Sequence, residues 1–169
     1  MKSLKASRPL VHNSMFLAIT PKQYDPHFIM LSEKTKNNVL NGGDFYRLYY
    51  SDEEATYNGL YVAFALQNTT VEKYFNKIKC CFSQKENRQV IEAIKGIEKS
   101  ILAQAPDAEN KHSVHRMEEQ LNNDYIKLFT EVHPNYGSAA RLELLLKVSG
   151  IWSNANEYGI TFRFFFIHR

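Results

Sequence analysis

A long terminal β-hairpin is predicted by the last 29 residues of the chain, which read RLELLLKVSGIWSNANEYGITFRFFFIHR from Arg141 to Arg169. On either side of the polar turn at 153–157, apolar residues share one parity: Leu142, Leu144, Leu146, Val148 and Trp152, then Tyr158, Ile160, Phe162, Phe164 and Phe166. This alternation indicates two antiparallel strands with a common apolar face. The opposite face is basic and aromatic, with Lys147, Arg163 and Phe165.

Three further strands are predicted upstream of this hairpin. The turn-forming residues 41–44 precede an aromatic run at 45–50, and apolar residues alternate from Gly59 to Leu66. A single strand is expected from about Val71 to Phe82. Its basic residues and one ring share the parity opposite to the core positions: Lys73, Phe75, Lys77 and Lys79.

Two helices are predicted between these strands and the terminal hairpin. Residues 83–86 match a capping box, and apolar residues follow at helical spacing up to Pro106. A second helix is expected from about Val114 to Glu131. The fold class is therefore expected to be α+β, antiparallel and strand-dominated. We expect an OB-like barrel or a curved sheet with two inserted helices and a C-terminal β-hairpin.

Length and composition favour one folded domain. The 169 residues are 44% hydrophobic and 23% charged, values typical of globular proteins, and no repeat or linker divides the chain. Residues 1–13, which include Lys2, Lys5 and Arg8, are interpreted as a basic N-terminal arm, and 14–169 as a single nucleic-acid-binding domain.

The cysteines and the first residues of the chain bear on its compartment. Cys80 and Cys81 are adjacent, and neighbours on a strand point to opposite faces, so a disulfide between them would be strained. No signal peptide and no apolar run of about 18 residues is visible. We expect an intracellular protein of a reducing compartment, cytoplasm or nucleus, with no membrane partner.

The candidate binding residues come from the aromatic content, 10 Tyr, 11 Phe and 1 Trp, and from its alternation with cations. A single-stranded nucleic acid exposes phosphates and unstacked bases, so its binder needs cations and flat rings together. The candidates are Arg47, Tyr49, Lys73, Phe75, Lys77, Lys79, Trp152, Arg163 and Phe165. The alternative is that helices cover Phe75 and Phe165 while the lysine stems extend past them to water.

Other chemistries have weaker support. His112 and His115 stand three residues apart without a thiol pair, so neither a metal nor another cofactor is expected. Residues 41–44 lack the Lys-Ser/Thr ending of a phosphate loop, and the acidic residues 52–54 are typical of a solvated loop. No nucleophile motif is present, and a non-enzymatic protein is expected.

Residues 146–152 (LKVSGIW) and 158–164 (YGITFRF) resemble the terminal hairpin of small single-stranded-DNA-binding replication proteins of DNA viruses and mobile elements. The resemblance covers about 25 residues and the general order of elements. It implies an OB-like barrel, binding with little sequence preference, and self-association. It also implies a groove lined by Trp152, Arg163, Phe165 and residues 73–79. Many such proteins end in an acidic tail, whereas this chain ends Phe166-Ile167-His168-Arg169.

The sequence thus predicts non-enzymatic binding of single-stranded nucleic acid, with DNA favoured by the resemblance, in replication or recombination. Homo-oligomers are expected as further partners. The alternative is a structural or protein-interaction module, of viral origin by the same resemblance, whose aromatic faces bury against a second copy or a host partner. An enzyme of nucleic-acid metabolism with dispersed catalytic residues is a third hypothesis.

Overall fold

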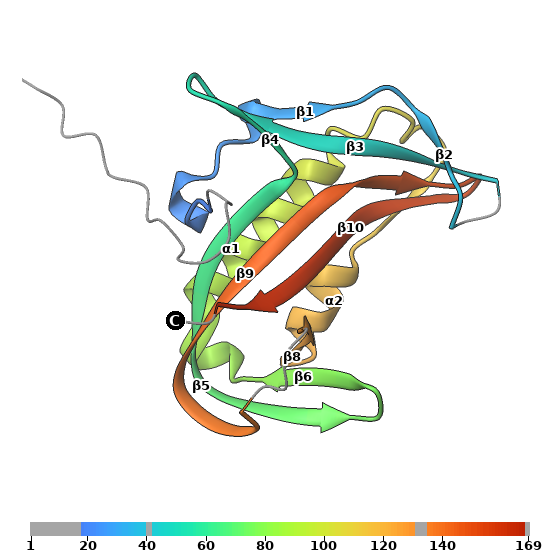
Figure 1. Ribbon diagram of the computed structural model, residues 1–169. Helices are drawn as coiled ribbons and strands as arrows, with labels where there is room; N and C mark the ends of the chain where they lie inside the picture. Colours follow the sequence, from blue (N-terminus) through green and yellow to red (C-terminus); the bar gives the residue numbers. More distant parts are fainter. Residues whose placement is uncertain (1–17, 40–41, 131–134, 168–169) are drawn as a thin grey trace, which may run out of the picture.

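A closed barrel of five strands lies at the centre of the computed structural model, which describes residues 18–39, 42–130 and 135–167 (Figure 1). The barrel strands are β5 (Leu60–Tyr74), β6 (Lys77–Cys81), β8 (Tyr125–Phe129), β9 (Gly137–Ser153) and β10 (Glu157–Phe166). Around the ring, β5 pairs with β6, β6 with β8, β8 with β10, β10 with β9, and β9 with β5. The expected basic arm lies outside the described residues.

The expected fold class, α+β and strand-dominated, is confirmed, and the sheet closes instead of remaining an open curve. The antiparallel expectation holds for four of the five barrel pairings, but β8 and β10 run parallel. The reason is the path of the chain. Strand β9 follows β8 but lies on the far side of β10 and runs in the opposite direction. The terminal hairpin then reverses the chain again, so β10 has the direction of β8. The barrel is therefore mixed.

The terminal hairpin is confirmed as β9 and β10, paired from Tyr158 opposite Ser153 to Phe166 opposite Leu144. In the turn, the Oδ1 atom of Asn154 accepts hydrogen bonds from the backbone N–H groups of Asn156 and Glu157, both at 2.8 Å. The register shifts by one residue between Thr161 and Phe162. Beyond this bulge Ile151 belongs to the core, so the expectation that Trp152 shares the parity of the β9 core residues is wrong.

The expected single strand from Val71 to Phe82 is wrong, because a tight turn divides it. Strand β5 continues to Tyr74, which pairs with Lys77 at the start of β6. Phe75 and Asn76 form the two-residue connection, and the φ angle of Phe75 is +53°. The parity of the lysines is the same on both sides of the turn, so alternation alone could not reveal the reversal.

The first expected helix is confirmed as α1 (Gln84–Leu102). Its capping box is not formed, because the Ser83 side chain makes no capping hydrogen bond and Glu86 instead accepts one from Asn68 at 3.1 Å. The Nδ2 atom of Asn87 donates to the Ser83 carbonyl at 3.0 Å, so the Asn87 side chain, and not that of Ser83, makes the polar contact at the start of α1.

The second helix is much shorter than expected. Helix α2 spans Arg116–Asn122, and the chain then turns at Asp124, where φ is +60°, and enters β8. The turn-forming run 122–124 ends the helix. The alternation of 125–129 fits a strand between β6 and β10, and this pairing outweighs the helical spacing of Leu121, Tyr125 and Leu128.

Four strands extend the sheet beyond the barrel: β1 (Ile29–Leu31), β2 (Thr35–Asn37), β3 (Gly43–Ser51) and β4 (Thr56–Asn58). We call them the wing. Strand β3 pairs with β9, and β1, β2 and β4 pair with β3. The short turns η1 (Pro21–Gln23) and η2 (Pro26–Phe28) precede the wing, and β7 (His112–Val114) adds to β10 (Figure 1).

The core lies inside the barrel and under α1, which runs behind β9 and β10 in the view of Figure 1. Leu144, Leu146 and Phe164 from the hairpin pack there with the apolar side of α1. The buried Glu98 of α1 accepts hydrogen bonds from the backbone N–H groups of Met117 and Glu118, at 3.1 and 2.7 Å, and so joins α1 to α2.

Neither helix has the length and apolar character needed to cross a membrane.

Candidate nucleic-acid interface

Four cations form a row across the outside of four neighbouring barrel strands. Lys79 on β6 lies opposite Lys127 on β8, and Arg163 on β10 lies opposite Lys147 on β9. The two pairs are adjacent. Strands β8 and β10 are parallel and pair Leu128 with Phe164, so the preceding residues, Lys127 and Arg163, lie side by side. Neighbouring strands are about 4.8 Å apart, so the row spans roughly 14 Å.

This row is electrostatically unfavourable for the folded chain, because like charges directly opposite each other on paired strands are destabilising. None of the four cations forms an ion pair with a carboxylate of the described residues. Glu72, which lies opposite Lys79 on β5, accepts a weak hydrogen bond from the Cys81 thiol at 3.6 Å instead. The residues opposite Lys127, Arg163 and Lys147 are basic or aromatic, so bound phosphates would supply counter-charge at these three cations.

Aromatic rings lie beside these cations. The Nζ atom of Lys79 is 3.8 Å from the ring centroid of Tyr74 and 4.5 Å from that of Tyr125. The guanidinium carbon of Arg163 is 4.8 Å from the centroid of Phe129, whose ring lies 6.3 Å from that of Phe165. Cation–π attraction holds the cations over the rings, so groups for phosphate binding and for base stacking share one surface.

We call this surface the basic-aromatic face. It is formed by Lys77, Lys79, Tyr125, Lys127, Phe129, Lys147, Arg163 and Phe165. The rings of Phe129 and, beside the face, Tyr74 are 47% and 48% exposed, which is unusual for large apolar side chains. Tyr125, Phe165 and the lysines of the row are half-buried, whereas Arg163 is exposed. Rings and cations side by side on one side of a barrel are the combination that single-strand binding requires.

Of the nine residues predicted from the sequence, four lie together on the basic-aromatic face: Lys77, Lys79, Arg163 and Phe165. Phe75 lies in the turn that borders the face and is 80% exposed, so the described helices do not cover it. Lys73 is exposed but lies opposite Ile78, so on the hairpin it points to the side opposite to Lys79.

Trp152 is placed elsewhere, because only 7% of it is exposed. Its ring packs over Gly159, where an added Cβ atom would lie 2.7 Å from the ring, and the guanidinium carbon of Arg116 is 5.3 Å from the ring centroid. A buried ring offers no face to a base, so we leave Trp152 out of the site. The resemblance to single-strand binders placed Trp152 in a groove, whereas its parity placed it with the apolar residues of the hairpin. The bulge in β9–β10 sets it against the neighbouring strand.

Arg47 and Tyr49 lie on β3 in the wing, away from the face. The Nη1 atom of Arg47 donates to Asn58 at 3.3 Å. Other polar groups of this region are similarly engaged: the Tyr46 hydroxyl donates to Asp107, and Lys34 lies 3.7 Å from both Asp44 and Asp107. Burial and the hydrogen bond to Asp107 raise the pKa of Tyr46, and the same bond lowers the pKa of Asp107.

Sequence reasoning missed Tyr125, Lys127 and Phe129, because they were assigned to a helix. Lys147 was recognised on the basic side of the hairpin but was not chosen for the site. A signal for β8 was present in the alternation of 125–129 after the turn-forming run 122–124. Nothing in the sequence revealed that this strand lies between β6 and β10.

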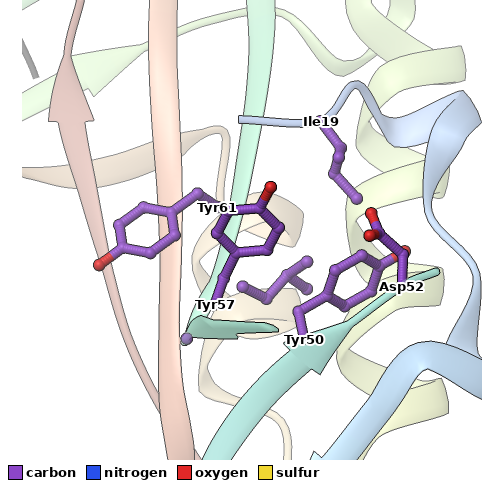
Figure 2. Close-up of a pocket in the computed structure, with 7 residues that line it drawn as sticks. Ile19, Tyr50, Asp52, Tyr57 and Tyr61 are labelled. Carbon is purple, nitrogen blue, oxygen red and sulfur yellow. The ribbon is translucent and has the colours of Figure 1, made fainter. Parts of the chain in front are cut away.

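A small hollow between the wing and β5 is shown in Figure 2. Its cavity volume is only about 10 Å³, and it is lined by Ile19, Tyr50, Asp52, Tyr57, Gly59, Leu60 and Tyr61. Cavities that bind small molecules usually exceed about 300 Å³. One oxygen of Asp52 already accepts hydrogen bonds from the backbone of Glu54 and Ala55, at 2.9 and 3.0 Å. The hollow is therefore a weaker candidate than the face.

The thiols and the acidic groups offer no comparable site. Cys80 is buried and Cys81 points to the outside, as adjacent strand residues must, and both are free. Burial raises the pKa of Cys80 to about 12 and also raises that of Cys81, which disfavours the reactive thiolate. Across 18–39, 42–130 and 135–167, no group of three or more His, Cys, Asp or Glu side chains is arranged to hold a metal ion.

Comparisons with protein-family models, with curated proteins and with solved structures find no match for this chain. The functional argument therefore depends on the arrangement of the residues themselves. The strongest arrangement is the basic-aromatic face, because it combines a row of like charges with aromatic rings on neighbouring strands.

Proposed function

We propose that this protein is a non-enzymatic binder of single-stranded nucleic acid, DNA in the first instance, in replication or recombination. The observation that carries the proposal is the row of Lys79, Lys127, Arg163 and Lys147. Two like-charged pairs on adjacent strands repel each other, and an anion lying across them relieves that repulsion. A chain of phosphates is such an anion.

The rings of the face supply the second part of the interaction. Stacking of a base on an aromatic side chain contributes about 1 to 3 kcal/mol and is tolerant of sequence, because every base has a flat face. Phe129 and Phe165 lie on adjacent strands and are the main stacking residues of this proposal. A duplex keeps its bases stacked on one another, so it would reach the cations but not the rings.

The barrel itself favours an OB-like scaffold. An OB fold is a five-stranded barrel that binds oligonucleotides on its second and third strands and in the loops after the first and fourth. In chain order the barrel strands here are β5, β6, β8, β9 and β10, so β6 and β8 are the second and third. They carry Lys79, Tyr125, Lys127 and Phe129, and the turn after the first strand carries Phe75.

Fluorescence anisotropy of a labelled oligonucleotide, single-stranded and duplex, at two salt concentrations tests the proposal. We expect tight binding of the single strand, weak binding of the duplex, and an affinity that falls as salt rises. Absence of single-strand binding at low salt would contradict the proposal. Equal binding of both forms would reduce the face to a phosphate-binding surface without stacking.

A second candidate function, self-association or a protein partner, is favoured by the apolar part of the same face. Phe129, Phe165 and Leu145 lie opposite one another on three adjacent strands. Phe129 is exposed and the other two are half-buried, and a partly exposed apolar row with a basic rim is also typical of protein interfaces. Sedimentation over a range of concentrations separates the two candidates. A dimer that forms without nucleic acid and is lost in Phe129→Ala would favour the interface.

A further inference from the structure

The turn between β5 and β6 holds an aromatic ring in an unusual position. Phe75 is 80% exposed and has a φ angle of +53°, in the left-handed region that bulky residues rarely adopt. Glycine or asparagine would fill this position without steric conflict, and Asn76 stands one residue later. The turn therefore keeps a strained, water-exposed ring where a small residue would stabilise the fold, and such strain is typical of functional positions.

The ring of Phe75 is supported from one side only. It makes an edge-to-face contact with Tyr74, with ring centroids 4.8 Å apart, and the Nζ atom of Lys79 lies 3.8 Å from the centroid of Tyr74. Phe75, Tyr74 and Lys79 thus form a short chain of contacts that ends at Lys79 on the basic-aromatic face. The hairpin connection has two residues, so the ring projects from a tight turn instead of a long loop.

We infer that Phe75 acts as a wedge at the junction between single-stranded and double-stranded nucleic acid. This inference depends on the proposed function, because the single strand must occupy the face for the turn to meet the junction. Apolar side chains that project from a protein can insert between neighbouring base pairs and unstack them. With the single strand on the cations of the face, the first base pair of the duplex lies against the turn, and Phe75 inserts beside it.

The test uses a duplex with a single-stranded arm and 2-aminopurine at the first base pair of the junction. Its fluorescence rises when the base is unstacked. Anisotropy of a label on the arm is measured in parallel, so that every variant is compared when the arm is saturated. The full-length protein is compared with Phe75→Gly and Phe75→Leu, and Met30→Ala, which alters an exposed apolar residue of the wing, is the matched control.

We expect the unaltered protein and Met30→Ala to raise the fluorescence several-fold, and Phe75→Gly to abolish most of that rise while keeping its affinity for the arm. Phe75→Leu should retain much of the rise, because a wedge needs apolar bulk and not a flat ring. Glycine accepts a positive φ without strain, so Phe75→Gly should unfold at a temperature no lower than the unaltered protein.

Three results would overturn the inference while leaving the proposed function intact. An equal fluorescence rise in Phe75→Gly would show that the ring does not open the junction. Equal losses in Phe75→Gly and Phe75→Leu, with reduced affinity for the arm, would make Phe75 one more stacking residue. Loss of a concentration-dependent dimer as the only effect of Phe75→Gly would assign the ring to an interface between copies. Failure of the unaltered protein to bind the arm would instead contradict the proposed function itself.

Discussion

The barrel and the wing contain the same kinds of residue, yet they use them differently. Both carry tyrosines and phenylalanines beside lysines and arginines. In the wing and just before it these groups have polar partners: Arg47 donates to Asn58, Tyr46 donates to Asp107, and Tyr24 shares a hydrogen bond of 2.5 Å with Ser100 of α1. On the barrel, Lys79, Lys127, Arg163 and Lys147 stand together without an ion pair to any described carboxylate.

The difference shows that residue type and alternation do not define a binding surface. A cation that already has a polar partner gains little from a phosphate, because it must first give up that partner. A cation held beside like charges gains more, because binding removes a repulsion. The predictions below follow from this contrast: changes on the face should affect binding, and changes in the wing should affect stability.

The largest effect is expected from removing three cations of the row at once. Lys79→Ala with Lys127→Ala and Arg163→Ala should lower affinity for a single strand on the order of a hundredfold at moderate salt. The salt slope should fall by about 2, or about 0.7 for each phosphate that is no longer neutralised. Anisotropy titrations at several salt concentrations measure both quantities. Thermal unfolding shows whether the variant is folded, because it loses both the repulsion within the row and the cation–π contacts of Lys79 and Arg163.

The matched control for this variant removes cations from the wing. Lys34→Ala with Arg47→Ala changes the same kind of charge but should leave affinity and salt slope nearly unchanged. If both variants weaken binding equally, the affinity reflects the overall positive charge of the chain, and the contrast between barrel and wing has no functional meaning.

A smaller effect is expected from removing one stacking ring. Phe129→Ala should weaken single-strand binding by about 1 to 3 kcal/mol, the contribution of one base on one ring, with the salt slope unchanged. The Phe129 ring is 47% exposed, so the fold should tolerate the change. Met30→Ala, an exposed apolar change in the wing, is the control and should bind like the unaltered protein. A changed salt slope in Phe129→Ala would indicate that Phe129 only positions Arg163.

The smallest effect at neutral pH is expected from Tyr24→Phe near the wing. The loss of the hydrogen bond to Ser100 should lower the free energy of unfolding by about 1 kcal/mol, with no change in affinity for a single strand. Denaturant unfolding and anisotropy measure the two quantities. Weaker binding in this variant would connect the two regions that the contrast separates.

The same tyrosine predicts a dependence on alkaline pH. Burial raises the pKa of Tyr24 to about 12 in the folded protein, from an ordinary value of 10. Between these values the unfolded chain releases the proton and the folded chain keeps it, so the free energy of unfolding should fall as pH rises from about 10 to about 12. The fall should be shallower in Tyr24→Phe. Identical pH profiles of the two proteins would contradict this assignment.

Much of the local structure could be predicted from the sequence. The alternation at both ends of the 153–157 turn predicted β9 and β10, and the helical spacing after Ser83 predicted α1, because both patterns extend over many residues. The short elements were harder to predict. Residues 125–129 fit a helix by spacing and a strand by alternation, and Phe75 was placed within a strand because it shares the parity of the lysines on both sides.

The chemistry of each segment follows from the order of its residues: which strands have an apolar side, where the helix α1 lies, and that rings and cations alternate. Which of these basic-aromatic segments meet was decided only by the tertiary structure. Strand β8 enters between β6 and β10 and so places Lys127 and Phe129 among Lys79, Arg163 and Phe165, whereas Trp152 is buried and Arg47 is paired in the wing. The physical reason is that register and strand order depend on pairing between segments far apart in the chain, and the pattern of one segment carries no information about its neighbours.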